Sequence, residues 1–106
     1  MKLLSRSEEI ILVAILKLGD DAYGAAIRRR HKRDTGAEWS FGSIYTPLNT
    51  LTRRGYVKKR RGEPTAERGG RHKCLYEITA AGKEALREIR RIQRRVRTCI
   101  PDIALD

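Results

Sequence analysis

Cysteine and histidine are scarce in this chain of 106 residues, which contains two of each. Cys74 and Cys99 are far apart and form no Cys-x-x-Cys pair, so neither a disulfide framework nor a zinc site is predicted. His72 and Cys74 fall on the same side of a predicted strand, but two ligands are too few for a metal centre. No Ser/His/Asp set, paired carboxylates or phosphate loop can be assembled, since His31 and His72 are the only histidines. We therefore expect neither an enzyme nor a cofactor.

Long apolar runs are also missing. The strongest run, 10–16, is flanked by Glu8-Glu9 and Lys17, which is the pattern of a buried helix and is too short to span a bilayer. We expect no signal peptide, no membrane partner and a reducing cytoplasmic location.

Acidic residues are few relative to basic ones. The chain has 13 Asp and Glu against 24 Lys and Arg, for a formal charge of +11. Between Arg28 and Arg97 there are 21 basic and 7 acidic residues. An excess of this size in a small domain indicates a polyanionic partner, most often nucleic acid.

One stretch, 40–55, has the properties of a DNA-recognition helix. Its apolar residues recur at three- and four-residue steps and so share one helix face: Phe41, Ile44, Leu48 and Leu51. The other face is short, polar and nearly free of acid, which suits close approach to the major groove. The candidate DNA-contacting residues here are Ser40, Gly42, Ser43, Tyr45, Thr46, Asn49, Thr50 and Arg53. An ordinary core helix with a polar outside remains the alternative.

The start of this helix is ambiguous because Pro47 lacks an N–H group and disfavours helical geometry at Thr46. Either the regular helix begins late, capped by Ser43, or it begins at Ser40 and bends at the Thr46-Pro47 step.

Two helices are predicted before this stretch. Ser5 and Glu8 form a capping-box pattern ahead of an apolar helix that we expect to lie between the core and a second subunit, with Ile11 and Leu12 at that contact. The second helix, about 22–35, has a strongly basic outer side, and we expect His31 to be a partly buried spacer. Trp39 is expected to be a core or short-strand residue.

A basic hairpin is predicted after the recognition helix. Two strands, 56–61 and 71–78, flank a turn-rich loop, with Cys74, Tyr76 and Ile78 on the side opposite Leu75. Such a hairpin would form the wing of a winged helix. Its candidate DNA contacts are Arg68, Gly69, Gly70, Arg71 and Lys73.

The last predicted helix begins after Thr79 as N-cap and carries one apolar seam. The seam residues are Leu86, Ile89, Ile92 and Val96, and arginines flank them. A small domain cannot bury this seam alone, so a coiled-coil-like dimer contact is expected. We divide the chain into a winged helix-turn-helix domain, 1–78, and a dimerisation helix with its tail, 79–106, forming one compact unit.

This arrangement resembles the PadR family of winged-helix transcription regulators. The resemblance rests on Asp21-Ala22-Tyr23-Gly24, on 42–48, on Leu51-x-x-x-Gly55-Tyr56-Val57, and on the pattern from Gly69-Gly70-Arg71 to Thr79-x-Ala81-Gly82. It covers nearly the whole chain. The single short C-terminal helix is similar to that of the family's smaller branch. Arg53-Arg54 stands where the family often has an acid, and we expect this pair to strengthen binding to the DNA backbone.

The resemblance implies a mainly α fold with a small β-hairpin, and a homodimeric, operator-binding regulator that is usually a repressor. A two-fold axis would present two recognition helices to a palindromic operator on double-stranded DNA. Effectors differ widely across that family, so a small-molecule effector is left unassigned. The competing hypothesis is a winged-helix module that binds an acidic protein partner.

Overall fold

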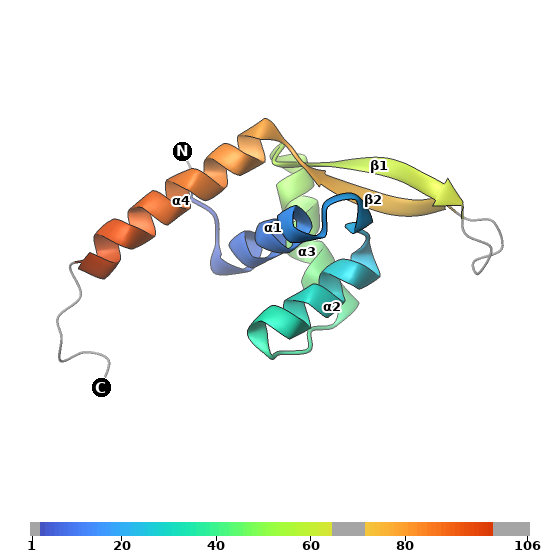
Figure 1. Ribbon diagram of the computed structural model, residues 1–106, viewed down its shortest axis with the longest axis horizontal. Helices are drawn as coiled ribbons and strands as arrows, with labels where there is room; N and C mark the ends of the chain where they lie inside the picture. Colours follow the sequence, from blue (N-terminus) through green and yellow to red (C-terminus); the bar gives the residue numbers. More distant parts are fainter. Residues whose placement is uncertain (1–2, 65–71, 99–106) are drawn as a thin grey trace.

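The computed structural model describes residues 3–64 and 72–98. Its elements follow the order α1 (Arg6–Leu18), a short 3-10 helix η1 (Gly19–Asp21), α2 (Gly24–Thr35), α3 (Phe41–Arg53), β1 (Val57–Pro64), β2 (His72–Ile78) and α4 (Ala80–Thr98). Four helices and one antiparallel hairpin confirm the predicted winged helix-turn-helix with a C-terminal helix (Figure 1).

Helix α1 is the centre of the core, and its start is fixed by the predicted capping box. The backbone N–H of Glu8 donates to Ser5 Oγ at 3.1 Å, and that of Ser5 donates to Glu8 Oε1 at 2.7 Å. Helices α2, α3 and α4 and strand β2 all pack against α1. Ile11 and Leu12 are fully buried inside this core, so they do not offer the surface to a second subunit that we expected. The small domain needs both sides of α1 for its own core.

Helices α2 and α3 form the helix-turn-helix. Gly36 ends α2 in the left-handed conformation, with φ of 76°, which favours glycine. In the connection, the Trp39 ring lies 4.1 Å from the His31 ring, centroid to centroid, and Arg28 Nε donates to the Trp39 carbonyl at 2.6 Å. His31 is more deeply buried than predicted, at 1% exposure. These contacts fix the angle at which α3 leaves the domain.

The hairpin is antiparallel from the pair Val57–Ile78 to the pair Arg61–Cys74. Burial along β2 does not follow the predicted alternation of sides, since Leu75 and Tyr76 are both buried and Cys74 is exposed. The segment before α2 explains the burial of Leu75. Tyr23 forms a bridge to Leu75, and Tyr76 N–H donates to the Ala22 carbonyl at 2.8 Å. Near Leu75, strand β2 is therefore paired along both of its edges, with β1 on one edge and the Tyr23 segment on the other.

Helix α4 starts at the base of the hairpin and runs away from it (Figure 1). Thr79 caps it as predicted, accepting a hydrogen bond from Gly82 N–H at 3.1 Å. Its first half is buried through Ala85, Leu86 and Ile89, and Gln93 Nε2 donates to Glu9 Oε2 of α1 at 2.7 Å. Within residues 3–64 and 72–98, no helix is long and apolar enough to cross a membrane.

Candidate nucleic-acid interface

Helix α3 begins at Phe41 with Ser40 as its N-cap, which decides between the two predicted starts. Ser43 N–H donates to Ser40 Oγ at 3.2 Å, and the helix continues through Pro47 to Arg53. Ile44, Leu48 and Leu51 are fully buried as expected. Phe41 was predicted to be part of that face, but it lies in the first turn and is 46% exposed. The Arg28 guanidinium covers its ring at 4.7 Å from the centroid.

The outer face of α3 is polar and open to solvent. The residues of this face that are exposed are Ser40, Gly42, Ser43, Thr46, Asn49 and Arg53, and Thr50 is half-exposed. Thr46 and Thr50 donate their hydroxyl hydrogens to carbonyls one turn back, at 3.0 and 3.2 Å, so their oxygens remain as acceptors. The Asn49 amide has no partner among the described residues. An exposed asparagine can form two hydrogen bonds to the edge of an adenine.

Tyr45 differs from the other candidates in α3 because it packs inward. Its ring is half-buried against the core, and it lies over the first residue of α2, Gly24. A Cβ atom at Gly24 would stand 2.0 Å from the Tyr45 hydroxyl oxygen. Tyr45 therefore supports the angle between α2 and α3, and its ring is not freely presented to a groove.

The two arginines at the end of α3 have different environments. Arg53 is exposed and donates to Thr50 Oγ1 at 3.3 Å, on the outer face. Arg54 instead forms an ion pair with the buried Glu8 carboxylate at 3.4 Å. We expected both arginines to strengthen backbone binding. For Arg54 that expectation is wrong, because its charge compensates a buried acid.

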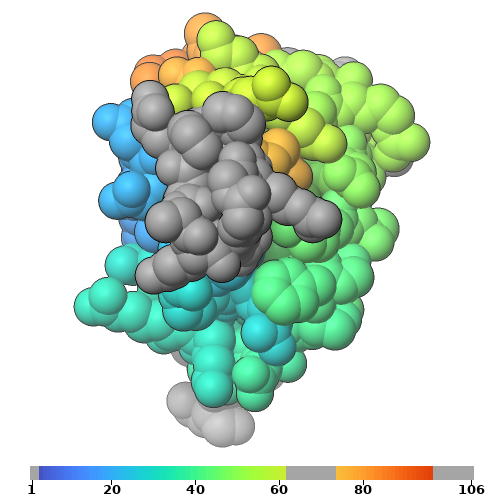
Figure 2. Space-filling view, turned by 90° about the vertical axis from the view of Figure 1, so that its right-hand side faces the viewer, coloured from blue at the N-terminus to red at the C-terminus, as the bar shows by residue number. Residues whose placement is uncertain are grey.

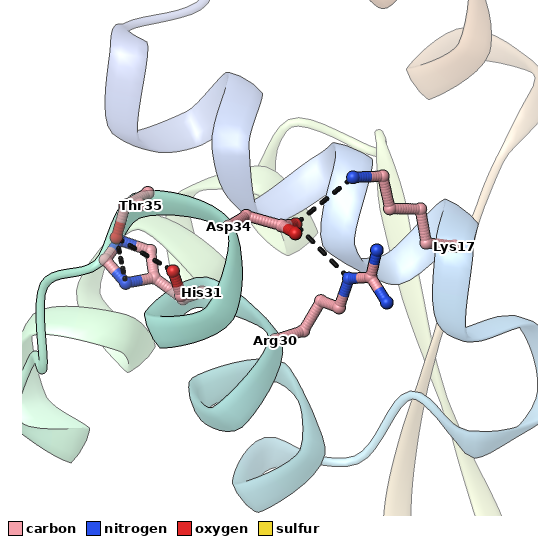
Figure 3. Close-up of polar contacts among 5 residues, drawn as sticks. All are labelled: Lys17, Arg30, His31, Asp34 and Thr35. Atoms are coloured by element: carbon pink, nitrogen blue, oxygen red, sulfur yellow. Dashed lines mark hydrogen bonds and ion pairs between the residues drawn. The ribbon is translucent and has the colours of Figure 1, made fainter.

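Much of the basic side of α2 is engaged within the domain. Arg30 Nε and Lys17 Nζ both contact Asp34 Oδ2, at 3.3 and 3.2 Å (Figure 3). Burial alone would raise the pKa of Asp34, but the hydrogen bonds from Lys17 and Arg30 outweigh it and lower that pKa from 3.8. Arg28 and Lys32 both contact Glu38.

Cations without an ion pair also lie in the two elements that pack against α3, namely α2 and β1. Within the described part of the chain, Arg33 of α2 and Arg61 of β1 are exposed and form no ion pair. Figure 2 shows α2, α3 and β1 following one another along one side of the molecule, from teal through green to yellow-green. The polar helix α3 therefore stands between two elements that carry unpaired positive charge, a combination that suits a nucleic-acid duplex.

A residue that the sequence did not single out also belongs to this side. A shallow hollow of about 570 Å³ beside the first turns of α3 is lined by Ser7, Trp39, Ser40, Gly42, Ser43, Thr46 and Pro47. Ser7 comes from the first turn of α1, which places a second helix start beside α3. Only tertiary packing brings them together, so no local pattern identified Ser7.

Several other predicted site residues are not placed on this surface. Arg68, Gly69, Gly70 and Arg71 lie outside the described residues. Lys73 lies in β2, at the hairpin end, and its side chain is not described. Tyr76 of β2 has a raised pKa. Burial of its phenol is the largest cause, and the neighbouring Cys74 thiol and Tyr45 phenol contribute further.

The predicted dimer residues divide into two groups. Ile11, Leu12, Leu86 and Ile89 are buried within the subunit, whereas Ile92 is half-buried and Val96 is 57% exposed. The uncovered part of the seam is therefore the second half of α4.

The described residues contain no group of three His, Cys, Asp or Glu side chains that could hold a metal ion.

The family model of the "Transcriptional regulator PadR-like family" matches residues 11–88. Functionally curated sequences give no significant match.

Solved structures with a similar fold include proteins described as transcription regulators. A transcriptional regulator from Clostridium thermocellum is 22% identical, with a TM-score of 0.75 over 92% of this chain and 89% of its own. A PadR family transcription regulator from hypervirulent Clostridium difficile is 26% identical, with a TM-score of 0.63 over 86% and 91%. A putative transcriptional regulator from Thermoplasma acidophilum is 25% identical, with a TM-score of 0.60 over 90% and 91%.

Proposed function

The chain belongs to the PadR-like family of transcriptional regulators, and we propose that it represses transcription by binding a specific operator in duplex DNA as a homodimer. Members of this family are regulators and not enzymes. The observation that carries the proposal is the outer face of α3. It is exposed, has no acid in its first turn, and offers hydroxyl and amide groups beside Arg53.

In this proposal α3 lies in the major groove. Asn49, Thr46 and Ser43 would contact base edges, because their side chains are short enough for the helix backbone to approach closely. Arg53 and the flanking Arg33 and Arg61 would contact phosphates. Phosphate contacts fix the position of the helix, and contacts to bases make it specific.

The wing would lie on the backbone or in the minor groove. Its loop sequence carries Arg68, Gly69, Gly70 and Arg71, and Lys73 follows in β2. Paired glycines without side chains allow close approach to a sugar–phosphate backbone, and the neighbouring arginines add charge. We propose that these residues hold the DNA without discriminating strongly between bases.

The proposed dimer uses the second half of α4. Val96 and Ile92 are the apolar seam residues that the subunit leaves uncovered. Pairing them across a two-fold axis would set two α3 helices on half-sites about 34–36 Å apart, or a multiple of that distance.

Val96→Asp should give monomers that keep their helical content, since an unpaired charge at the contact is costly. Val96→Ile is the matched control and should remain dimeric in sedimentation.

The direct test is selection of bound fragments from the source genome, followed by affinity measurements at several salt concentrations. If two subunits neutralise about 6–10 phosphates, affinity should fall by roughly 10³–10⁵ between 50 and 200 mM salt. Selected fragments that share a palindrome would support the proposal. An affinity that hardly changes with salt would favour the acidic-protein hypothesis instead.

A further inference from the structure

Helix α4 carries a straight stripe of basic side chains that the proposed function does not use. Lys83, Arg87, Arg90 and Arg94 follow one another at steps of four, three and four residues, and all four are exposed. Residues at these steps lie on one helix face, one turn above the other. We name these four residues the α4 stripe. The sequence continues the spacing to Arg97, one residue before α4 ends.

Most of the α4 stripe faces away from the body of the domain, whereas Lys83 lies at the rim of a hollow that Ile15 and Leu16 of α1 also line. On the opposite side of the helix, Ala85, Leu86 and Ile89 are buried, and Gln93 is hydrogen-bonded to Glu9 of α1. Beyond Lys83, the stripe is therefore turned away from α1. It is separate from the outer face of α3, which packs its own apolar residues against the same core.

The positive charge of the stripe is only partly compensated. The two acids in α4, Glu84 and Glu88, lie beside the stripe and contact Arg87 at 2.9 Å and Arg91 at 2.7 Å. Within the described residues, Lys83 and Arg90 form no ion pair. Two cations without an ion pair on one exposed helix face are suited to an anionic partner.

The composition of the stripe favours a nucleic-acid backbone over an acidic protein. Arginine matches phosphate geometry with two parallel hydrogen bonds, and three of the four residues are arginine. From Lys83 to Arg94 the helix rises about 16 Å, which is the axial span of about five phosphates on one strand. The stripe has no apolar residue, whereas a protein interface has an apolar centre. It also has no Asn, Gln, Ser or Thr to read bases.

We propose that the α4 stripe binds the backbone of a second duplex segment without sequence preference, so that one molecule holds two DNA segments. The first segment is the one that α3 reads, and to that extent the inference rests on the proposed function. The second segment needs no operator, because only phosphates are contacted. Such bridging would bring distant DNA next to an occupied operator.

The test is a bridging assay with two duplexes. A duplex selected from genomic fragments is immobilised and loaded with the protein, and a labelled duplex of unrelated sequence is then offered in solution. The stripe variant is Arg90→Gln with Arg94→Gln. The matched control is Arg91→Gln with Arg95→Gln, which removes the same charge from the neighbouring face of the same helix.

We expect the wild-type protein and the control to capture the labelled duplex, and the stripe variant to capture it at least about tenfold less. The slope of log affinity for the second duplex against log salt should fall by about 2, one for each lost phosphate contact. Retention of the stripe variant on the immobilised duplex should stay within about twofold of wild type, because α3 is unchanged. Circular dichroism verifies that both variants keep their helices.

Four outcomes would overturn the inference. Equal loss of capture in the stripe variant and the control would mean that net charge, and not the stripe, matters. Wild-type protein that is retained on the selected duplex but captures no second duplex would refute bridging alone and leave the proposed function intact, whereas failure of retention would refute both. Stripe-dependent capture of a labelled polyglutamate peptide, without capture of DNA, would assign the stripe to an acidic protein.

Discussion

Gly82 lies in the first turn of α4, where the helix touches the start of the wing. A Cβ atom at this position would stand 2.3 Å from the Tyr56 carbonyl oxygen and 2.8 Å from Ile78 Cγ1, whereas ordinary contacts begin at 3.4 Å. The Tyr56 carbonyl belongs to the backbone and also accepts a hydrogen bond from Thr79 N–H at 3.0 Å. Gly82→Ala therefore requires a backbone shift of about 1 Å between α4 and the wing.

The magnitude follows from opposing contributions. Overpacking costs about 1–3 kcal/mol, and a weakened Thr79–Tyr56 hydrogen bond costs about 1 kcal/mol. Alanine returns about 1 kcal/mol through its higher helix propensity. We expect Gly82→Ala to lower the free energy of unfolding by about 1–3 kcal/mol, measured by urea unfolding at fixed protein concentration.

Gly42→Ala is the matched control for this substitution. Gly42 is an exposed residue in the first turn of α3, and its added Cβ would meet only Ser40 Oγ at 3.9 Å. Without a clash, the propensity gain should leave the domain as stable as wild type or slightly more stable. The packing argument would be refuted if Gly82→Ala were as stable as Gly42→Ala.

Two further predictions concern charged residues. Arg54→Ala should lower the free energy of unfolding by about 1–3 kcal/mol because it leaves Glu8 buried without its partner. Arg53→Ala should change the free energy of unfolding by no more than about 0.5 kcal/mol and should instead weaken DNA binding. Equal stabilities of the two variants in urea would contradict this. Asp34→Asn should lower stability by about 0.2–1 kcal/mol at neutral pH, since the ion pairs are near the surface. The lowered pKa of Asp34 stabilises the fold above 3.8 and is lost as the pH falls through the folded-state value, so urea midpoints of Asp34→Asn and wild type should converge in acid.

The fold could be predicted from the sequence because its local signals agree with one another. The Ser5–Glu8 capping box, Gly36 after α2 and Thr79 before α4 each mark a helix end, and the structure has them there. The three- and four-residue steps of Ile44, Leu48 and Leu51 identified the buried face of α3. Such signals need no knowledge of tertiary contacts.

The errors fall where tertiary packing decides. Periodicity cannot say which element covers an apolar face, so Ile11 and Leu12 were assigned to a partner although the subunit buries them. Arg54 resembles Arg53 in sequence, and only the fold brings it to Glu8 across 46 residues. The burial of Leu75 as well as Tyr76 was not predicted, because a bridge from Tyr23 cannot be read from alternation. The helix face that carries the candidate surface could therefore be predicted from the sequence. Which residues lie on that surface depended on tertiary contacts.

The central claim is that the outer face of α3 reads bases, and Asn49→Ala tests it most directly. The assay compares affinity for a selected genomic duplex with affinity for random duplex DNA, with Arg53→Ala as the phosphate-contact control. Loss of a good base contact by Asn49→Ala should reduce the free-energy preference for the selected duplex over random DNA by about 1–3 kcal/mol. Arg53→Ala should weaken both affinities similarly. If Asn49→Ala leaves the ratio unchanged, α3 does not read DNA with this face.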